Sequence, residues 1–337
     1  MLKVVLVSNW PFIRIQALKR IAESQHNMSA LIILPDTSKK RTKRVVTRIL
    51  AGIPGGPRIS GQLSGRITPE KVELYRTAKL ADVRIYEVTD INASKLISRL
   101  HKLRPDVVLT LAWPKKFGRE LLQLPTLGCI NCHPSLLPFH RGPNPIPRAI
   151  LAGDTKSGVT FHFMNEEFDL GDILMQKQVP IHATDNSRTL QDKCAAVAKD
   201  SLTELLDGLD TGKLHGVPQE RNAGSYAANF KKSDLNIDWE KTSAEIDCKM
   251  RALLPGHQSY TYHKAQKIVI TRVEKRQVEP TFRPGQIVSI SAEGLLIASK
   301  DAGLLLQEFV FAELSEQSSR QYSDNQMKTG DILGSIA

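Results

Sequence analysis

The stretch CINCHPSLLPFHRGPNPIPRAILAGDTKSGVTFHFMNEEFDLGD, from Cys129 to Asp172, decides the fold and the chemistry of this chain. It holds an amide at Asn131, an imidazole at His133 and a carboxylate at Asp169, with a Ser-Leu-Leu-Pro turn among them. Asn131 and His133 are two residues apart at the end of a predicted strand, so both side chains point to one face. Such groups can polarise a carbonyl and move protons without a metal or a covalent intermediate. The residues therefore indicate transfer of an acyl group to an amine.

Outward from this stretch, short apolar segments alternate with helical ones. Strands are predicted over residues 3–8, 29–35, 83–88, 106–113 and 128–133, and helices around residues 15–22, 93–103 and 116–124. The alternation predicts an α/β fold with a doubly wound, mostly parallel sheet. Active sites in such sheets lie beyond the carboxyl ends of the strands, which is where residues 111–113 and 131–133 fall.

The rest of the chain predicts a second, smaller domain. A helix from Asn144 to Gly153, strands over 159–164 and 172–181, and a long helix over 187–206, ended by Gly208, complete the first domain. Apolar residues become sparse over residues 211–232, which we interpret as a linker. A helix over 243–254 and short strands over 267–275, 285–291, 294–299 and 303–311 then indicate a small β-barrel. The predicted organisation is a domain over residues 1–210, a linker over 211–232 and a barrel domain over 233–337.

The bulk properties indicate a globular protein. Of the 337 residues, 41% are apolar and 24% are charged, which is ordinary for a folded domain. No apolar run approaches the roughly 20 residues of a membrane span. The apolar start, MLKVVLVSNWPF, lacks a small-residue cleavage site and is better interpreted as a first strand than as a signal peptide. We therefore expect a cytoplasmic monomer without membrane association.

The net charge of +11 is unevenly distributed. Residues 212–337 carry 16 Lys and Arg against 15 Asp and Glu, so nearly all the net positive charge lies in the first 211 residues. A basic loop over residues 38–48 holds Lys39, Lys40, Arg41, Lys43, Arg44 and Arg48. If a polyanion binds, we expect it to be attracted to this N-terminal part.

The four cysteines are too few for a disulfide framework at this length. Cys129 and Cys132 form a C-x-x-C pair, which is also found in redox and zinc sites. The sequence has no second Cys/His pair at ligand spacing, so we expect reduced, buried thiols and no metal. It also lacks the glycine-rich patterns typical of dinucleotide and triphosphate sites.

The order Asn-x-His, Ser-Leu-Leu-Pro and Asp-x-Gly-Asp closely resembles that of the folate-dependent formyltransferase family. The resemblance runs from about Met1 to Val273, and the strings PIPRAI, GVT and FDLGD follow in the same order. It implies a Rossmann-like formyltransferase fold followed by an OB-like β-barrel, the oligonucleotide-binding type. Within the family, the chain is most similar to the members that formylate methionyl-initiator tRNA.

The resemblance also implies a role for each site residue. Asn131 and His133 would hold the negative charge that develops on the formyl oxygen, and Asp169 would orient His133 or a water and handle the proton. The formyl donor would be 10-formyltetrahydrofolate, bound as a co-substrate. Its pocket would be lined by Leu111, Ala112, Trp113, Ser135, Leu136, Leu137 and Pro138 and closed by residues 164–168. We expect His140 and His162 to be structural.

Two kinds of amine could receive the formyl group. Lys39, Lys40, Arg41, Lys43 and Arg44 resemble a family loop that enters the tRNA acceptor stem, and Arg141 could bind a tRNA phosphate or an acidic substrate. Alternatively, the loop is a solvated surface and Arg141 forms a surface ion pair. The strings Phe139-His140 and Pro143-Asn144 depart from those usual in tRNA-formylating members. With the nearly neutral barrel, they favour a small amine, such as an amino sugar or an amino acid. A non-catalytic RNA- or folate-binding protein and a hydrolase that releases formate are further alternatives.

Overall fold

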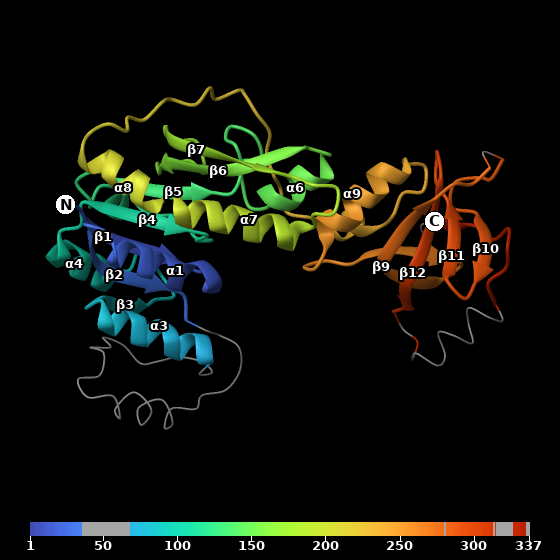
Figure 1. Ribbon diagram of the computed structural model, residues 1–337, viewed down its shortest axis with the longest axis horizontal. Coiled ribbons are helices and arrows are strands. Elements are labelled where there is room, and N and C mark those ends of the chain that lie inside the picture. The colour runs from blue at the N-terminus through green and yellow to red at the C-terminus, as the bar shows by residue number, and fades with distance from the viewer. Residues whose placement is uncertain (36–67, 280, 313, 315–325, 335–337) are drawn as a thin grey trace. The chain divides into compact units, whose positions relative to one another are not determined.

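The computed structural model describes residues 1–35, 68–279, 281–312, 314 and 326–334. The chain divides into two compact units that interleave along the sequence (Figure 1). The first unit comprises residues 1–143, 158–179 and 192–226, and the second comprises residues 144–157, 180–191 and 227–337. The boundaries at residues 210 and 232 stay predictions. The basic loop over residues 38–48, with all its lysines and arginines, lies outside the described residues.

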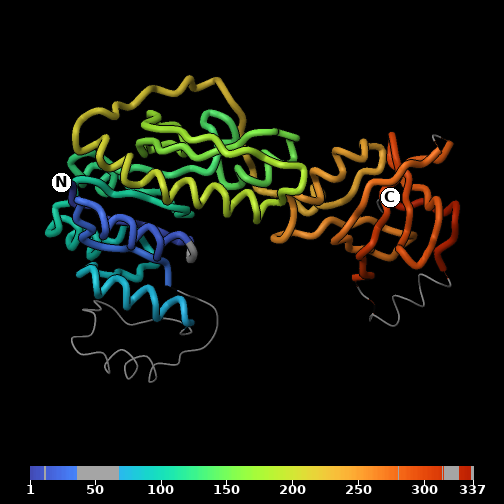
Figure 2. The backbone as a smooth tube through the Cα atoms, in the orientation of Figure 1, coloured from blue at the N-terminus to red at the C-terminus, as the bar shows by residue number. Residues whose placement is uncertain are grey.

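The first unit is built on a seven-stranded sheet with the order β3-β2-β1-β4-β5-β6-β7. Its strands are β1 (Lys3–Ser8), β2 (Asn27–Ile33), β3 (Arg84–Glu87), β4 (Val107–Leu111), β5 (Cys129–His133), β6 (Lys156–Phe163) and β7 (Ile173–Pro180). The first five pair in parallel, and β6 pairs antiparallel with β5. The strand order reverses between β1 and β4. Figure 2 traces the backbone from blue at the N-terminus to red at the C-terminus. The expected doubly wound, mostly parallel α/β sheet is confirmed.

Helices follow most of these strands. They are α1 (Pro11–Ala22), α3 (Pro69–Leu80), α4 (Ser94–Leu103), α5 (Arg119–Leu122), α6 (Pro145–Leu151), α7 (Ser187–Asp200) and α8 (Leu202–Asp210). Helix α4 shows why they pack on the sheet, because Leu96, Ile97 and Leu100 form one buried stripe. This stripe lies against Val5 and Val108 of the sheet in a common core. Within the described ranges, no helix is both long enough and apolar enough for a membrane span.

The helix predicted over residues 187–206 is divided in the structure. Helix α7 ends at Asp200 and α8 begins at Leu202, and between them the Ser201 hydroxyl donates to the Val197 carbonyl at 2.8 Å. Such back-bonding competes with regular helical geometry. Gly208 does not end the helix, since α8 continues to Asp210. Leu214 packs so closely on Gly208 that a Cβ there would lie 2.6 Å from the leucine Cδ1. The helix ends instead at Asp210, just before Gly212, whose φ of +65° suits the turn that closes a helix.

The second unit holds a six-stranded antiparallel sheet with the order β10-β11-β12-β9-β8-β13. The strands are β8 (Ser259–His263), β9 (Gln266–Arg276), β10 (Ile287–Ser291), β11 (Gly294–Ala298), β12 (Gly303–Phe311) and β13 (Leu333–Gly334), preceded by the 3-10 helix η1 (Lys232–Leu235) and by α9 (Ser243–Leu253). The two edges of the sheet meet. The Ile287 N–H donates to the Asp331 carbonyl and the Leu333 N–H to the Gly285 carbonyl, both at 2.8 Å. The sheet therefore curls into the expected OB-like barrel.

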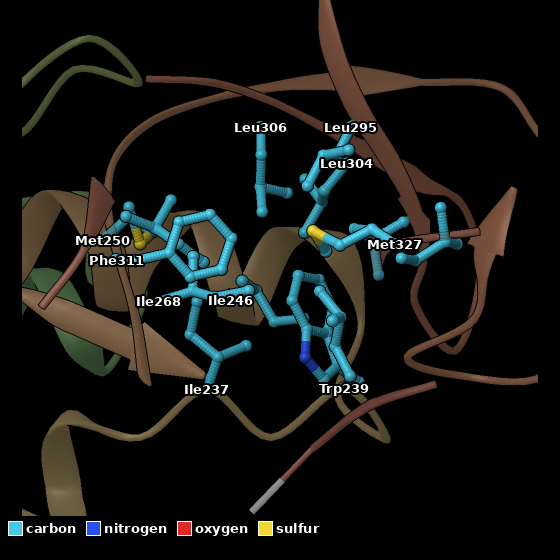
Figure 3. Close-up of a cluster of buried hydrophobic side chains, with 14 residues drawn as sticks. Ile237, Trp239, Ile246, Met250, Ile268, Leu295, Leu304, Leu306, Phe311 and Met327 are labelled. Atoms are coloured by element: carbon cyan, nitrogen blue, oxygen red, sulfur yellow. The ribbon is translucent and has the colours of Figure 1, made fainter. Parts of the chain in front are cut away.

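The interior of the barrel is filled by apolar side chains from its strands and from the segment before them (Figure 3). Ile246 and Met250 of α9 belong to the same cluster. Trp239 is buried, and its indole N–H donates to the Thr261 hydroxyl at 3.0 Å. Its one polar atom is thus paired inside the core.

Ile297→Ala is expected to lower the free energy of unfolding by about 2–5 kcal/mol, because the cavity that alanine leaves in a buried core is only partly refilled. This β11 side chain is fully buried. Urea unfolding followed by tryptophan fluorescence measures the change. Ile290→Ala, on β10 and 38% exposed, is the control and should cost about 1 kcal/mol or less. Equal losses in the two variants would contradict the packing of the barrel.

Candidate active site

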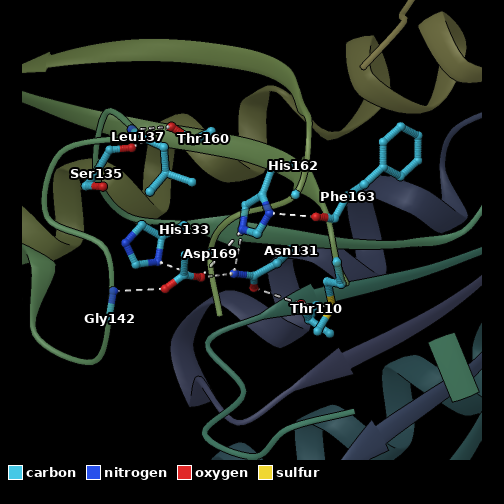
Figure 4. A network of polar contacts seen from close by, with 12 residues as sticks. Thr110, Asn131, His133, Ser135, Leu137, Gly142, Thr160, His162, Phe163 and Asp169 are labelled. Atoms are coloured by element: carbon cyan, nitrogen blue, oxygen red, sulfur yellow. Dashed lines mark hydrogen bonds and ion pairs between the residues drawn. The ribbon is translucent and has the colours of Figure 1, made fainter. Parts of the chain in front are cut away.

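The end of β5 carries two of the three predicted catalytic side chains, Asn131 and His133 (Figure 4). Because alternate residues of a strand share a face, both point to the same side of the sheet. Strand β6 runs antiparallel to β5, with His162 opposite Asn131 and Thr160 opposite His133. The register therefore places a second imidazole beside the Asn131 amide.

Asp169 reaches the same place from the turn between β6 and β7. Its Oδ1 lies 3.3 Å from Asn131 Nδ2 and 3.5 Å from His133 Nδ1. Its Oδ2 accepts a hydrogen bond from the Gly142 N–H at 2.9 Å. The structure thus brings Asn131, His133 and Asp169 together, while their catalytic roles stay predictions.

The turn that carries Asp169 depends on a close approach of two backbone segments. Asp169 has a φ of +56°, in the left-handed region that non-glycine residues seldom adopt. A Cβ at Gly171 would lie 1.8 Å from the Phe163 carbonyl oxygen, so only glycine fits there. Gln219 supports the turn, since its Nε2 donates to the carbonyls of Asp169 and Gly171 at 3.0 and 2.7 Å.

The Asn131 amide is held at both ends. Its Oδ1 accepts a hydrogen bond from the Thr110 hydroxyl at 2.8 Å. Its Nδ2 faces Asp169 Oδ1 and lies 3.2 Å from His162 Nε2. The orientation turns the amide N–H, the part that can stabilise a developing oxyanion, toward the carboxylate and the two imidazoles.

His133 is buried with one nitrogen committed. Its Nε2 lies 2.9 Å from the His140 carbonyl oxygen, which can only accept, so Nε2 carries the proton. Burial lowers the pKa of His133 from its usual 6.5, although the Asp169 carboxylate acts in the opposite direction. In the neutral ring, Nδ1 is therefore unprotonated, and its lone pair is directed at Asp169. A proton arriving at Nδ1 would turn this contact into an ion pair.

Asp169 is ionised although it is buried. Burial alone would raise the pKa of its carboxyl, but His133, His162 and the Gly142 N–H together lower it to about 2. At neutral pH the site therefore combines one carboxylate, one neutral imidazole with a free lone pair and one oriented amide. This set can accept a proton and stabilise negative charge on an oxygen.

The Ser135–Pro138 turn, predicted to bind the donor, is tied to β6 and β7. The Thr160 hydroxyl donates to the Ser135 carbonyl at 2.7 Å and accepts from the Leu137 N–H at 3.1 Å. Gln176 Nε2 donates to the Leu137 carbonyl at 2.8 Å. Ser135 and Leu137 are buried, whereas Leu136 and Pro138 are half-buried. The accessible surface of this turn is therefore that of Leu136 and Pro138.

Leu111, Ala112 and Trp113, the other part of the predicted donor site, lie at the end of β4. Leu111 is opposite Cys132 in the register and is buried, so its side chain belongs to the core. Ala112 is exposed, with a φ of +54°. Trp113 packs partly on the core, and its Nε1 is buried without a hydrogen-bond partner. Ala112 and Trp113 are therefore the positions here that suit a ligand contact.

Arg141 is held by residues of the predicted linker. Its N–H donates to the Ser225 carbonyl at 2.9 Å, and its Nη1 donates to the Arg221 carbonyl at 3.3 Å. The neighbouring His140 N–H donates to the Ser225 hydroxyl at 3.0 Å. The segment from Gln219 to Tyr226 therefore supports both the Asp169 turn and the loop that contains Arg141.

Sequence reasoning missed several residues that hold the site in place, namely Thr110, Thr160, Gln176 and Gln219. Each is a polar residue in an apolar strand or in the predicted linker, and its role is visible only from its partner in space. A usable signal existed for Thr110 and Thr160. A hydroxyl inside a buried strand must find a hydrogen-bond partner, so it marks a place where another segment approaches.

The C-x-x-C pair is not bonded in the structure. Cys129 and Cys132 are free and buried, and burial raises the pKa of both thiols, which disfavours the reactive thiolate. Over the described part of the chain, no three His, Cys, Asp or Glu side chains are grouped as a metal site requires.

Gly224→Ala is expected to destabilise the first unit by more than Gly212→Ala does. Both glycines have a positive φ, which costs about 1 kcal/mol for alanine. A Cβ at Gly212 meets nothing within 4 Å, whereas at Gly224 it would lie 2.0 Å from the Pro138 carbonyl oxygen, so the backbone must move. Urea unfolding of the two variants measures the difference. A loss in Gly224→Ala no larger than in the control would contradict the close approach.

Comparisons with known proteins agree with this architecture. A family model described as formyl transferase matches residues 4–206, and one for the formyl transferase C-terminal domain matches residues 229–325. The chain is 33% identical over 299 residues to a methionyl-tRNA formyltransferase of Geobacillus sp. (strain WCH70), covering 89% of this chain and 86% of the relative. It is 28% identical over 331 residues to that of Alkaliphilus metalliredigens (strain QYMF), covering 98% of each. A solved Helicobacter canadensis N-formyltransferase, in complex with folinic acid and dTDP-3-aminofucose, shares the fold with a TM-score of 0.61 and 17% identity, over 91% of this chain and 99% of that one. This chain belongs to the formyltransferase family.

Proposed function

We propose that this formyltransferase moves the formyl group of 10-formyltetrahydrofolate to the amino group of methionyl-initiator tRNA. The observation that carries the proposal is the convergence of the Asn131 amide, the His133 imidazole and the Asp169 carboxylate at the end of β5. The Geobacillus and Alkaliphilus relatives, both named methionyl-tRNA formyltransferase, support this choice of acceptor because they match along nearly the whole chain.

The transfer begins when the amine nitrogen attacks the formyl carbon. A new C–N bond forms and negative charge develops on the formyl oxygen, where the Asn131 N–H stabilises it. The bond from the formyl carbon to N10 of the folate then breaks, and the proton lost by the amine ends on N10. Removal of one oxyanion donor typically costs about 2.7–4 kcal/mol of transition-state stabilisation.

His133 and Asp169 handle the proton. The lone pair on His133 Nδ1 accepts the proton that the attacking amine loses, directly or through a water. The imidazolium that forms is stabilised by the ionised Asp169 carboxylate, 3.5 Å from Nδ1, and by the His140 carbonyl on Nε2. The protonated Nδ1 is then a second donor toward the formyl oxygen and can return the proton to N10.

The donor would lie between the end of β4 and the Ser135–Pro138 turn. A flat pterin requires apolar surface with a few well-placed polar groups. Leu136 and Pro138 offer accessible apolar surface, and the buried, unpartnered indole N–H of Trp113 suits a ligand acceptor. The Helicobacter canadensis structure contains folinic acid, which supports a folate as the donor here.

The acceptor would be bound through its phosphates by Arg141 and by Lys39, Lys40, Arg41, Lys43 and Arg44. Transfer to a small amine is the second candidate, because residues 212–337 are nearly neutral and the Helicobacter canadensis structure contains an amino-sugar nucleotide. Both candidates use the same catalytic residues.

We expect the protein to act as a monomer in the cytoplasm.

Asn131→Ala is expected to lower kcat by about 100- to 1000-fold, because it removes the donor to the formyl oxygen. The assay contains 10-formyltetrahydrofolate and charged initiator tRNA and measures formyl-methionyl-tRNA. Asn27→Ala, an exposed position at the start of β2, is the control and should keep full activity.

Three outcomes would contradict the proposal. Unchanged turnover in Asn131→Ala would remove the catalytic assignment. Formylation of an amino sugar or amino acid under conditions where tRNA is not formylated would exclude the tRNA acceptor. Release of formate without any amine would indicate a hydrolase.

The rate is expected to fall in acid with a midpoint below the usual histidine value. The reaction requires the unprotonated lone pair of His133, and burial lowers the pKa of this group from 6.5, so activity persists to lower pH than an ordinary histidine would allow. Asp169→Asn removes the charge that opposes this shift, so its midpoint should be lower still. The pH dependence of kcat/KM measures both. A midpoint above 6.5 would contradict the assignment of His133 as the proton acceptor.

A further inference from the structure

We propose that His162 is a positioning residue for formyl transfer, which fixes the Asn131 amide so that its N–H, and not its oxygen, faces the reacting carbonyl. The inference rests on the proposed role of Asn131 as oxyanion donor. It gives a function to an imidazole that the sequence predicts to be structural.

The His162 ring has a defined donor and a defined acceptor. It is 2% exposed, and its Nδ1 lies 2.8 Å from the Phe163 carbonyl oxygen. A carbonyl oxygen can only accept a hydrogen bond, so Nδ1 carries the proton and Nε2 carries the lone pair. This lone pair lies 3.2 Å from Asn131 Nδ2 and accepts its N–H (Figure 4). His162 therefore presents a pure acceptor to the amide.

An asparagine side chain can be turned so that its oxygen and nitrogen exchange places, and Thr110 does not distinguish the two orientations. The Thr110 hydroxyl donates to Asn131 Oδ1 in this structure. In the exchanged orientation it could accept from the amide nitrogen and donate to the Ile130 carbonyl, which lies 3.2 Å away. The orientation of the Asn131 amide must therefore be set by the contacts at its other end.

His162 and Asp169 decide the orientation. The exchanged amide would direct Asn131 Oδ1 at the lone pair of His162 and at the Asp169 carboxylate, where it could form no hydrogen bond with either. The observed orientation supplies an N–H to both acceptors, at 3.2 and 3.3 Å. The imidazole and the carboxylate themselves are 3.6 Å apart, too far for a hydrogen bond, so each acts on the amide separately.

The consequence concerns the second hydrogen of the amide. One hydrogen of Asn131 Nδ2 is committed to His162, and the other points toward Asp169 Oδ1. When negative charge develops on the formyl oxygen, this second hydrogen exchanges Asp169 Oδ1 for the formyl oxygen, while the hydrogen bond to His162 prevents rotation of the group. His162 thus acts through Asn131 and does not contact the substrate.

His162→Leu is expected to lower kcat about 10-fold, with KM for folate and acceptor changed less than about twofold, as for a group that acts only in the transition state. His162→Gln keeps an acceptor in this place and should recover most of the loss. The control is His26→Leu. His26 is equally buried, with one nitrogen accepting from the Leu2 N–H at 3.2 Å and the other 2.9 Å from Asp207, so this variant loses stability but keeps kcat.

A double-mutant cycle with Asn131→Ala tests the route of the effect. If His162 acts through Asn131, His162→Leu lowers kcat no further in the Asn131→Ala background. A similar 10-fold loss in both backgrounds overturns the proposal. So does a His162→Leu variant with unchanged kcat, or a His162→Gln variant as slow as His162→Leu.

A measurement without turnover separates this proposal from the proposed function. Nitrogen-15 NMR of the wild-type protein should show the proton of His162 on Nδ1, and the Asn131 side-chain amide signals should shift in His162→Leu and not in His26→Leu. If the wild-type protein formylates no acceptor, the proposed function fails and these spectra still decide the contact. A proton on His162 Nε2, or unchanged Asn131 signals, overturns the positioning role.

Discussion

A buried, ionised carboxylate is the constraint around which the candidate active site of the first unit is arranged. A charge removed from water is costly unless it is hydrogen-bonded and near compensating groups. Asp169 receives the Gly142 N–H and the Asn131 amide and lies beside two imidazoles, which together hold its pKa near 2. Its partners come from β5, from β6 and from the loop after β5. The requirement to satisfy one side chain therefore fixes the relative positions of three segments.

The same arrangement prepares the site for proton movement. A carboxylate that stays ionised at all physiological pH values is a fixed negative charge beside the free lone pair of His133. When a proton reaches that lone pair, the positive charge appears where the field already favours it, so little reorganisation is needed. Thr110 and Thr160 add precision, because each uses one hydroxyl to hold a site group against a neighbouring strand.

The sheet, the barrel and the shared face of Asn131 and His133 could be predicted from patterns within short windows of the sequence. The approach of Asp169, 38 residues from Asn131, is implied only by the family resemblance. Alternating apolar strands and helices imply a parallel sheet, and residues two apart at a strand end share a face. The supporting residues could not be predicted in the same way. Gln219 lies 50 residues beyond the aspartate whose carbonyl it binds. His162 gains its partner only from the antiparallel register of β6 on β5, which propensity does not specify.

The segment from Gln219 to Tyr226 has a consequence for how the chain can be divided. It contacts the carbonyls of the Asp169 turn, the Pro138 carbonyl and the backbone of Arg141. A fragment truncated at residue 210 would retain Asn131, His133 and Asp169, the three side chains with a proposed catalytic role. It would lose the segment that holds the Asp169 turn and the loop of Arg141 in place. A minimal fragment for formyl transfer therefore has to extend through Tyr226. Proteolytic nicking between these residues would disable the site without removing a single reactive group.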